Sequence, residues 1–300
     1  MATATVTATI NTPAFLHAGW LDEYTSKGYT ILRGVFTPDE IATLREAFDR
    51  TYAEAMQHAK TWRHQNRVMW IHQSDKIGKF ISGCQWQSWA DPVLNKIRTD
   101  PRMLAIIEPM IGNHVKQIIN QMHWKVPHSG YTWGLHQDVR SRKPDHCFRD
   151  LGRSYVQTGL AIDRHWAGNG AMKIMPYSHL RGDLSMDNGK SSHSDTREQA
   201  VANAGFDPSK LIDIEMEPGD IALWTPYTIH GGGINTTNDN QRRMYINGYV
   251  KAQNCDRGQP VFHHGAPVPL TIPAHIQYDD LYVRPEPHYP DDKATLQPRD

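Results

Sequence analysis

Residues 211–224 read LIDIEMEPGDIALW and carry the pattern that decides the fold. Apolar residues at 212, 214 and 216 alternate with acidic residues at 213, 215 and 217, as in a strand with one buried face. The Pro-Gly-Asp that follows predicts a turn, because these residues suit the backbone angles that turns require. The apolar run at 221–224 then predicts the next strand, so this stretch indicates a β-rich domain.

Short apolar runs elsewhere in the chain extend this pattern. They predict strands at 115–126, 156–163, 171–175 and 244–250. Several short strands separated by turn residues are typical of a β-sandwich or a jelly-roll barrel.

Helices are expected beside these strands. Thr37, Pro38 and Glu40 form a capping box with proline at the first helical position, which predicts a helix start. Residues 91–112 predict one or two further helices. The expected fold class is therefore mainly β with flanking helices.

The chain is expected to form one domain, residues 15–300, with its core at 115–250 and a disordered or loosely held tail at 1–14. A polar insertion at 182–210 interrupts the strands and is interpreted either as a lid or substrate loop or as a solvated connection. Residues 258–300 are rich in proline and weak in periodicity, which predicts an irregular C-terminal extension.

Composition narrows the classes of partner. The 32 basic and 32 acidic residues give a formal net charge of zero, which argues against a strongly cationic surface for nucleic acid or anionic membrane. The three cysteines form no CxxC pair, which fits a reducing compartment better than a disulfide framework. No apolar run approaches the roughly 18 residues of a membrane span, and the N-terminus does not read as a signal peptide. A cytoplasmic protein is expected.

The strongest candidate for chemistry is His136-Gln137-Asp138. Side chains of an extended segment alternate, so His136 and Asp138 would point the same way and could hold one metal ion. The spacing alone is weak evidence, because a chain with 17 histidines contains such pairs by chance. His193 and Asp195 form a second pair, but they lie in the polar insertion with no apolar strand around them.

A third ligand is expected near the start of a later strand. His230 follows the predicted strand at 221–224 and precedes three glycines, which allow close backbone approach. Two histidines and one carboxylate leave open metal positions, an arrangement typical of oxygen-activating Fe(II) sites. Arg242 follows, and guanidinium can hold a carboxylate through two hydrogen bonds. Taken singly, His230 could be an ordinary histidine and the pair Arg242-Arg243 a solvated turn.

The order of these residues resembles the Fe(II)/2-oxoglutarate dioxygenases and, among them, the phytanoyl-CoA dioxygenase family. Four further stretches resemble segments of that family: GYTILRGVFTPDEI at 28–41, QMHWKVP at 121–127, AIDRHWAGNGAMKIMPYSHLRG at 161–182 and EPGDIALWTPYTIHGGGIN at 217–235. Together they span about residues 28–250, most of the chain.

The resemblance implies a double-stranded β-helix, the jelly roll of cupin-like proteins. It implies Fe(II), 2-oxoglutarate and O₂ as cofactor and co-substrates, with ascorbate as a stimulant. It also implies hydroxylation or another oxidation of an unactivated C–H bond, while 2-oxoglutarate is decarboxylated to succinate. Because the family's halogenating relatives have Gly or Ala at the position of Asp138, hydroxylation is the default expectation.

Carried over by position, the resemblance implies iron ligands at His136, Asp138 and His230. It implies Arg242 as the partner of the distal carboxylate of 2-oxoglutarate, with Gln121 and Gln137 as further contacts to that co-substrate.

Three positions depart from the family pattern. The loop from His230 to the arginine is one residue longer than expected, so Arg243 is an alternative to Arg242. Gly232 stands where the family often has serine, and Gly159 stands where it often has tryptophan. These departures concern the co-substrate pocket.

Two other classes of function remain open at this level. A nucleic-acid demethylating dioxygenase shares the same motif order, and a cupin-like metal protein without oxygenase activity would use a similar fold. A small metabolite or natural-product intermediate is preferred as substrate, while the sequence does not indicate an oligomeric state. Basic and aromatic residues could line a polar substrate pocket or lie on the surface, namely Arg63, Arg67, Trp70, Lys76, Arg140 and Arg142.

Overall fold

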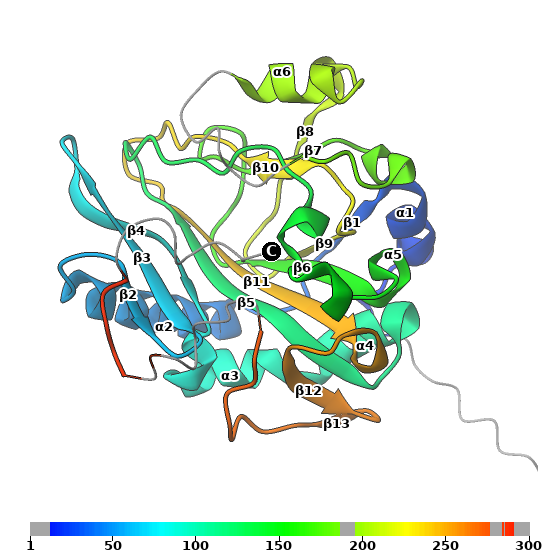
Figure 1. Cartoon of the computed structure of the whole chain (residues 1–300). Coiled ribbons are helices and arrows are strands. Elements are labelled where there is room, and N and C mark those ends of the chain that lie inside the picture. Colours follow the sequence, from blue (N-terminus) through cyan, green and yellow to red (C-terminus); the bar gives the residue numbers. More distant parts are fainter. Residues whose placement is uncertain (1–12, 187–195, 277–283, 285, 291–300) are drawn as a thin grey trace, which may run out of the picture.

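The computed structural model describes residues 13–186, 196–276, 284 and 286–290. A large antiparallel sheet runs through the molecule in the order β1-β9-β6-β11-β5-β4-β3-β2, with the hairpin β12-β13 joined to β5 (Figure 1). A three-stranded sheet in the order β10-β7-β8 faces it. The predicted fold class, mainly β with helices in a jelly roll, is confirmed.

The strands have the following bounds. The large sheet contains β1 (Tyr29–Leu32), β2 (Trp62–His64), β3 (Arg67–Ser74), β4 (Gly78–Gln85), β5 (Val115–Lys125), β6 (Tyr155–Ala161), β9 (Ile221–Trp224), β11 (Arg242–Lys251), β12 (Gln259–His263) and β13 (Ala266–Pro267). The small sheet contains β7 (Met172–Ile174), β8 (Ile212–Asp213) and β10 (His230–Gly232).

The described residues form six α-helices in addition to the two sheets. They are α1 (Trp20–Lys27), α2 (Pro38–Met56), α3 (Pro92–Arg98), α4 (Pro101–Ile111), α5 (Leu151–Ser154) and α6 (Thr196–Asn203). Helix α2 begins at the predicted capping box, in which the Thr37 side chain accepts from the Glu40 backbone and Glu40 accepts from the Thr37 backbone. None of the helices in the described ranges is both long and apolar enough to cross a membrane.

Side-chain alternation on the central strands gives the large sheet two cores. On one face, Trp124 of β5 and Tyr245 of β11 pack with Phe48 of α2. On the other face, Met244 of β11 belongs to the cluster that contains Met172 of the small sheet. Because neighbours on one strand point to opposite faces, β11 contributes to the helix-side core and to the space between the sheets at once.

Several elements differ from the sequence prediction. Residues 60–90 gave no clear pattern, but they form the three-stranded meander β2-β3-β4, whose apolar positions do not alternate regularly. The expected strand at 211–217 shortens to β8, and Met216 pairs only through an isolated bridge with His165. The C-terminal extension contains β12, which the sequence did not predict because its pairing partner is the distant β5.

The polar insertion also contains an unpredicted helix, α6. Val201 of α6 packs fully buried in a small cluster with Leu135 and Ile229, close in sequence to the predicted metal ligands. The pair His193 and Asp195 lies outside the described residues, as do residues 1–12 of the predicted tail.

The turn before β9 fixes the edge of the large sheet against α2. Gly219 has φ +97, and its carbonyl accepts a hydrogen bond from the Phe36 backbone at 3.1 Å. A Cβ at this position would collide with the Phe36 carbonyl oxygen. The Pro-Gly-Asp turn therefore needs glycine for both its backbone angle and its packing.

We expect Gly219→Ala to destabilise the protein more than Gly130→Ala. Gly130 also has a positive φ, +66, but a Cβ there meets nothing within 4 Å. The control should lose about 1–2 kcal/mol from the left-handed backbone alone, and Gly219→Ala about 1–3 kcal/mol more from the clash. Urea unfolding measures both, and equal losses would contradict the packing argument.

Candidate active site

Backbone pairing brings the first and third predicted ligands together. The His136 backbone N–H donates a hydrogen bond to the His230 carbonyl at 2.8 Å, and the His230 N–H donates one to the His136 carbonyl at 3.0 Å. Gly231, the next residue, lies so close to the chain that a Cβ would sit 2.7 Å from the Gly134 carbonyl oxygen. The two imidazole centroids lie 4.3 Å apart as a result.

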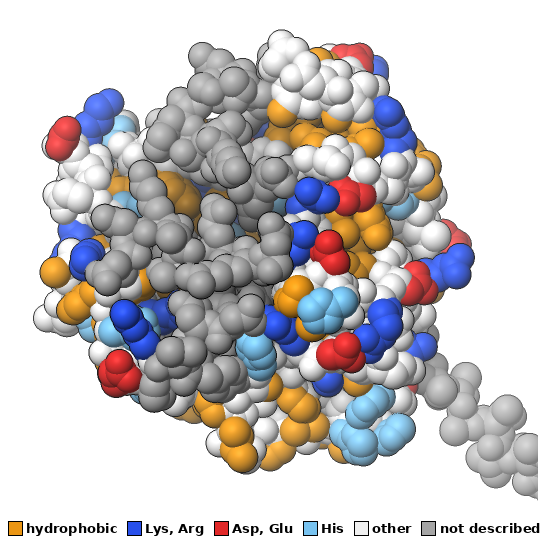
Figure 2. All heavy atoms as spheres, viewed as in Figure 1, with side chains coloured by type: hydrophobic (Ala, Val, Ile, Leu, Met, Phe, Trp, Pro, Cys, Tyr) orange, Lys and Arg blue, Asp and Glu red, His pale blue; other side chains and the backbone are white. Residues whose placement is uncertain are grey.

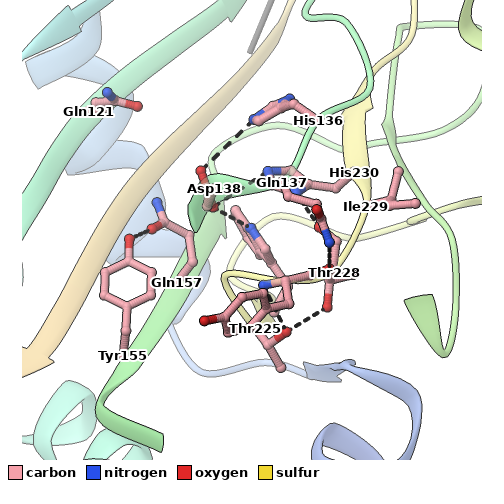
Figure 3. A network of polar contacts seen from close by, with 12 residues as sticks. Gln121, His136, Gln137, Asp138, Tyr155, Gln157, Thr225, Thr228, Ile229 and His230 are labelled. Atoms are coloured by element: carbon pink, nitrogen blue, oxygen red, sulfur yellow. Dashed lines mark hydrogen bonds and ion pairs between the residues drawn. The ribbon is translucent and has the colours of Figure 1, made fainter. Parts of the chain in front are cut away.

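The second ligand comes from the same short segment. Gln137 has extended backbone angles, so the side chains of His136 and Asp138 lie on the same side of the chain (Figure 3). Asp138 begins a 3₁₀ turn, Asp138–Ser141. Its Oδ1 lies 3.9 Å from Nε2 of His136, and its Oδ2 lies 3.6 Å from Nε2 of His230. One ligand atom from each of the three residues lies within 4.8 Å of the others, and all three residues are buried.

Second contacts orient the three groups. Nδ1 of His136 donates to the Gly134 carbonyl at 2.8 Å, and Nδ1 of His230 donates to the Thr228 carbonyl at 2.9 Å. Because a carbonyl only accepts, Nδ1 of each ring carries a proton, and Nε2 of each ring faces Asp138. Indole Nε1 of Trp224 donates to Oδ2 of Asp138 at 3.0 Å.

The charges suit a divalent metal. Burial would raise the pKa of Asp138, but the nearby His230, Arg142 and His136 and the bond from Trp224 together lower it, so the carboxylate is ionised at neutral pH. Burial, reinforced by His230, lowers the pKa of His136 to about 4, so its imidazole is neutral there. Two imidazoles and one carboxylate form the donor set that binds Fe(II) while leaving positions open.

The two adjacent arginines of β11 point to opposite faces. Arg243 is bonded to Asp163 through its Nε at 2.8 Å and to Asp49 through Nη1 at 2.7 Å. Arg242 is 3% exposed, and its Nε has no hydrogen-bond partner in the described part of the chain. Asp163, the carboxylate that acts on Arg242 electrostatically, is bonded to Arg243 instead. Arg242 is therefore the arginine with hydrogen-bonding capacity left for a ligand.

The structure assigns Gln137 a different surrounding from the one expected. Its amide donates to the Gly182 and Tyr227 carbonyls at 2.8 and 2.6 Å, and its carbonyl accepts from the Leu184 backbone at 2.7 Å. These bonds use the amide to tie the ligand segment to two loops. Gln121 lies on β5 and bonds to Nε2 of His123 at 3.1 Å, with its amide on the site side of the large sheet (Figure 3).

A buried arginine lies beside Asp138, and the sequence had indicated it only as a candidate pocket or surface residue. Arg142 is 2% exposed and lies 3.3 Å from Oδ1 of Asp138, and it donates to the Tyr155 hydroxyl at 2.7 Å. Tyr155 in turn bonds to Gln157 of the same strand. The spacing of four residues between Asp138 and Arg142 does not predict this contact, because the segment forms a 3₁₀ turn followed by a loop and not an α-helix.

The remaining basic and aromatic candidates are scattered. Arg63 is buried, Arg67 pairs with Glu54 and Arg140 with Asp183, while Lys76 is exposed. Trp70 alone joins the site, through an edge contact with Trp133 at 6.0 Å.

Comparison with known proteins places the chain. The model of the phytanoyl-CoA dioxygenase (PhyH) family matches residues 24–244, which include all three clustered ligands and Arg242. The chain belongs to this family. The prediction of a 2-oxoglutarate-dependent dioxygenase, with iron and 2-oxoglutarate as cofactors, is therefore confirmed for this PhyH protein.

Individual relatives of the dioxygenase are distant. A probable alpha-ketoglutarate-dependent hypophosphite dioxygenase of Stutzerimonas stutzeri is 21% identical over 236 residues, 77% of each chain. The crystal structure of EctD from S. alaskensis with 2-oxoglutarate and 5-hydroxyectoine has a TM-score of 0.64 at 17% identity, covering 89% of this chain and 93% of that one. The epimerase SnoN, in complex with Fe³⁺, alpha ketoglutarate and nogalamycin RO, has a TM-score of 0.57 at 18% identity, covering 80% and 85%.

We expect Trp224→Phe to weaken metal binding by about 10–100-fold, because the Asp138 carboxylate loses the donor that orients it. Trp124→Phe is the matched control: Trp124 is equally buried, but it packs on the helix side of the large sheet. Titration of each variant with Fe(II) under anaerobic conditions measures the change. Equal losses in both variants would assign the effect to packing.

Proposed function

We propose that the dioxygenase oxidises an unactivated C–H bond of a small organic molecule, with hydroxylation as the default outcome. His136, Asp138 and His230 would hold Fe(II), and Arg242 would bind the distal carboxylate of 2-oxoglutarate. The observation that carries the proposal is the buried cluster of two imidazoles and one ionised carboxylate, together with the Arg242 guanidinium, whose Nε has no hydrogen-bond partner among the described residues. When bound, Fe(II) with 2-oxoglutarate and O₂ supplies the oxidation, which yields succinate, CO₂ and the hydroxylated product.

The residues around the metal would supply orientation. The Nδ1 bonds of both histidines fix their rings, and Trp224 holds one carboxylate oxygen of Asp138. Arg142 lies beside the other oxygen, and together with His230 and His136 it lowers the pKa of the carboxyl. A fixed set of three ligands on one face directs 2-oxoglutarate and O₂ to the open positions.

Arg242 supports a dicarboxylate co-substrate. Among the described residues its guanidinium donates to Sδ of Met244, a weak acceptor, at 3.9 Å. Burial lowers the pKa of Arg242 to about 10, which still leaves it charged at neutral pH. Lys125 of β5 adds a second cation to this region, since a Cβ on Gly232 would lie 2.9 Å from its Nζ and 3.8 Å from Nη2 of Arg242. Two cations in this region favour an anionic ligand, such as a dicarboxylate that would bind the metal at one end and the cations at the other.

An aromatic wall beside the site supports an organic substrate. His123 stacks on Trp133 with centroids 5.0 Å apart, and Tyr131 and Trp70 contact Trp133 edge-on at 5.6 and 6.0 Å. Burial, with Arg242 and Lys125 nearby, lowers the pKa of His123 to about 3, so this ring is also neutral. Small-molecule sites are commonly lined by such rings with a few polar groups among them.

The proposed metal site is tested by anaerobic addition of Fe(II) and 2-oxoglutarate to metal-free protein. We expect a weak visible absorption band that requires both additions, and succinate release once O₂ is admitted. Asp138→Ala should abolish both, because two imidazoles alone bind the metal loosely. A band of unchanged intensity in Asp138→Ala would refute the ligand assignment.

The proposed co-substrate site is tested by comparing the two adjacent arginines. Arg242→Gln should raise the dissociation constant for 2-oxoglutarate by about 100-fold, because a charge-assisted contact is worth about 2–5 kcal/mol to binding when its partner is left buried. Arg243→Gln should lower the melting temperature, because it breaks the bonds to Asp163 and Asp49, and should change 2-oxoglutarate binding little. The reverse pattern would assign the role to Arg243.

A further inference from the structure

A second group of three histidines lies at the β12-β13 hairpin. His114 precedes β5, His263 ends β12 and His264 follows it. One ring nitrogen from each lies within 4.8 Å of the others, and the ring centroids are 4.5 to 5.1 Å apart. Figure 2 shows histidine side chains gathered at this edge of the molecule, over the hairpin that Figure 1 labels. In the described part of the chain, this group and the active-site triad are the two clusters with metal-binding potential.

The backbone holds the three residues together independently of their side chains. Strand β12 pairs with the start of β5, where Phe262 lies opposite Val115. The Gly265 N–H donates to the Asn113 carbonyl at 2.9 Å, which ties the hairpin turn to the residue before His114. The sequence places these segments far apart, so the cluster exists only because β12 joins the large sheet.

His264 occupies a backbone position that other residues fill more easily. The turn between His263 and Ala266 has φ +49 at His264 and +83 at Gly265, the signs of a type I′ hairpin, in which Asn-Gly is the usual pair. An L-residue with a side chain as large as histidine is strained there, and such strain often accompanies a function. Here it directs a third imidazole toward His114 and His263.

The chemistry of the group is that of a site for a borderline divalent cation. The cluster offers only imidazole nitrogens, which suit Zn²⁺, Cu²⁺ and Ni²⁺ better than Mg²⁺ or Ca²⁺. Nδ1 of His114 is buried and has no hydrogen-bond partner within the described residues.

We propose that His114, His263 and His264 form a second metal site that binds Zn²⁺, with a water molecule as fourth ligand. Tetrahedral zinc with bonds near 2.0 Å needs ligand nitrogens about 3.4 Å apart. The ligand nitrogens, which lie within 4.8 Å of one another, can reach that separation by side-chain rotation, since His263 and His264 are both exposed. The bound ion would fasten the hairpin to the first residues of β5, and it would take no part in the oxidation at the triad.

The test is a zinc titration of the full chain without an affinity tag, in competition with a chromophoric chelator. We expect two equivalents in the wild type, one at the triad and one at the hairpin. His264→Ala should bind one equivalent, and the double variant His136→Ala with His230→Ala should also bind one. His128→Ala is the matched control and should bind two, since His128 is likewise exposed with a positive φ of +60.

Two outcomes overturn the proposal: a single equivalent in the wild type, or two equivalents that persist in His264→Ala. Circular dichroism checks that His264→Ala is folded, and His263→Gln repeats the test with the turn residue unchanged. The ligands are identified by X-ray absorption at the zinc edge on the variant with both His136 and His230 replaced. About three imidazole nitrogens near 2.0 Å are expected, and a shell made mainly of oxygen would refute the site.

Discussion

The paired backbone hydrogen bonds between His136 and His230 are the constraint on which the active site depends. They join the segment after β5 to the first residue of β10 in the small sheet. Two histidines that are far apart in the sequence thereby become neighbours. The absence of a side chain at Gly231 permits this approach, and the Nδ1 bonds to the Gly134 and Thr228 carbonyls then determine which nitrogen each ring presents. The backbone therefore determines how close the two histidines lie and how their rings are oriented.

The second organising feature is the distribution of charge across one strand. Arg242 and Arg243 are adjacent on β11, and alternation sends them to opposite faces of the large sheet. Arg243 is satisfied by Asp163 and Asp49 on the helix side. Arg242 enters the space between the sheets with its Nε unpaired among the described residues. Asp163, the carboxylate that acts on Arg242 electrostatically, is hydrogen-bonded to Arg243, so Nε of Arg242 keeps hydrogen-bonding capacity for a ligand.

At the two positions where glycine departs from the family pattern, neighbouring side chains fill the space beside the glycine. Gly232 leaves room that Lys125 fills, since a Cβ there would approach its Nζ to 2.9 Å. Gly159 leaves room for Met244 and Trp224, whose side chains occupy the position of its missing Cβ. Side chains from β5, β9 and β11 therefore occupy the space beside both glycines.

The sequence by itself determined the strands with clear alternation, the capping box of α2, the family and the order of His136, Asp138, His230 and Arg242, because each of these depends on local periodicity or on motif spacing. Only the tertiary structure decided which of two adjacent arginines binds Asp163 and Asp49, that Gln137 bonds to two loops, and that Arg142 lies beside Asp138. It also decided that β12 joins β5 and brings three distant histidines together. These outcomes depend on contacts between segments far apart in the chain, and local sequence does not predict which distant segment a side chain will contact.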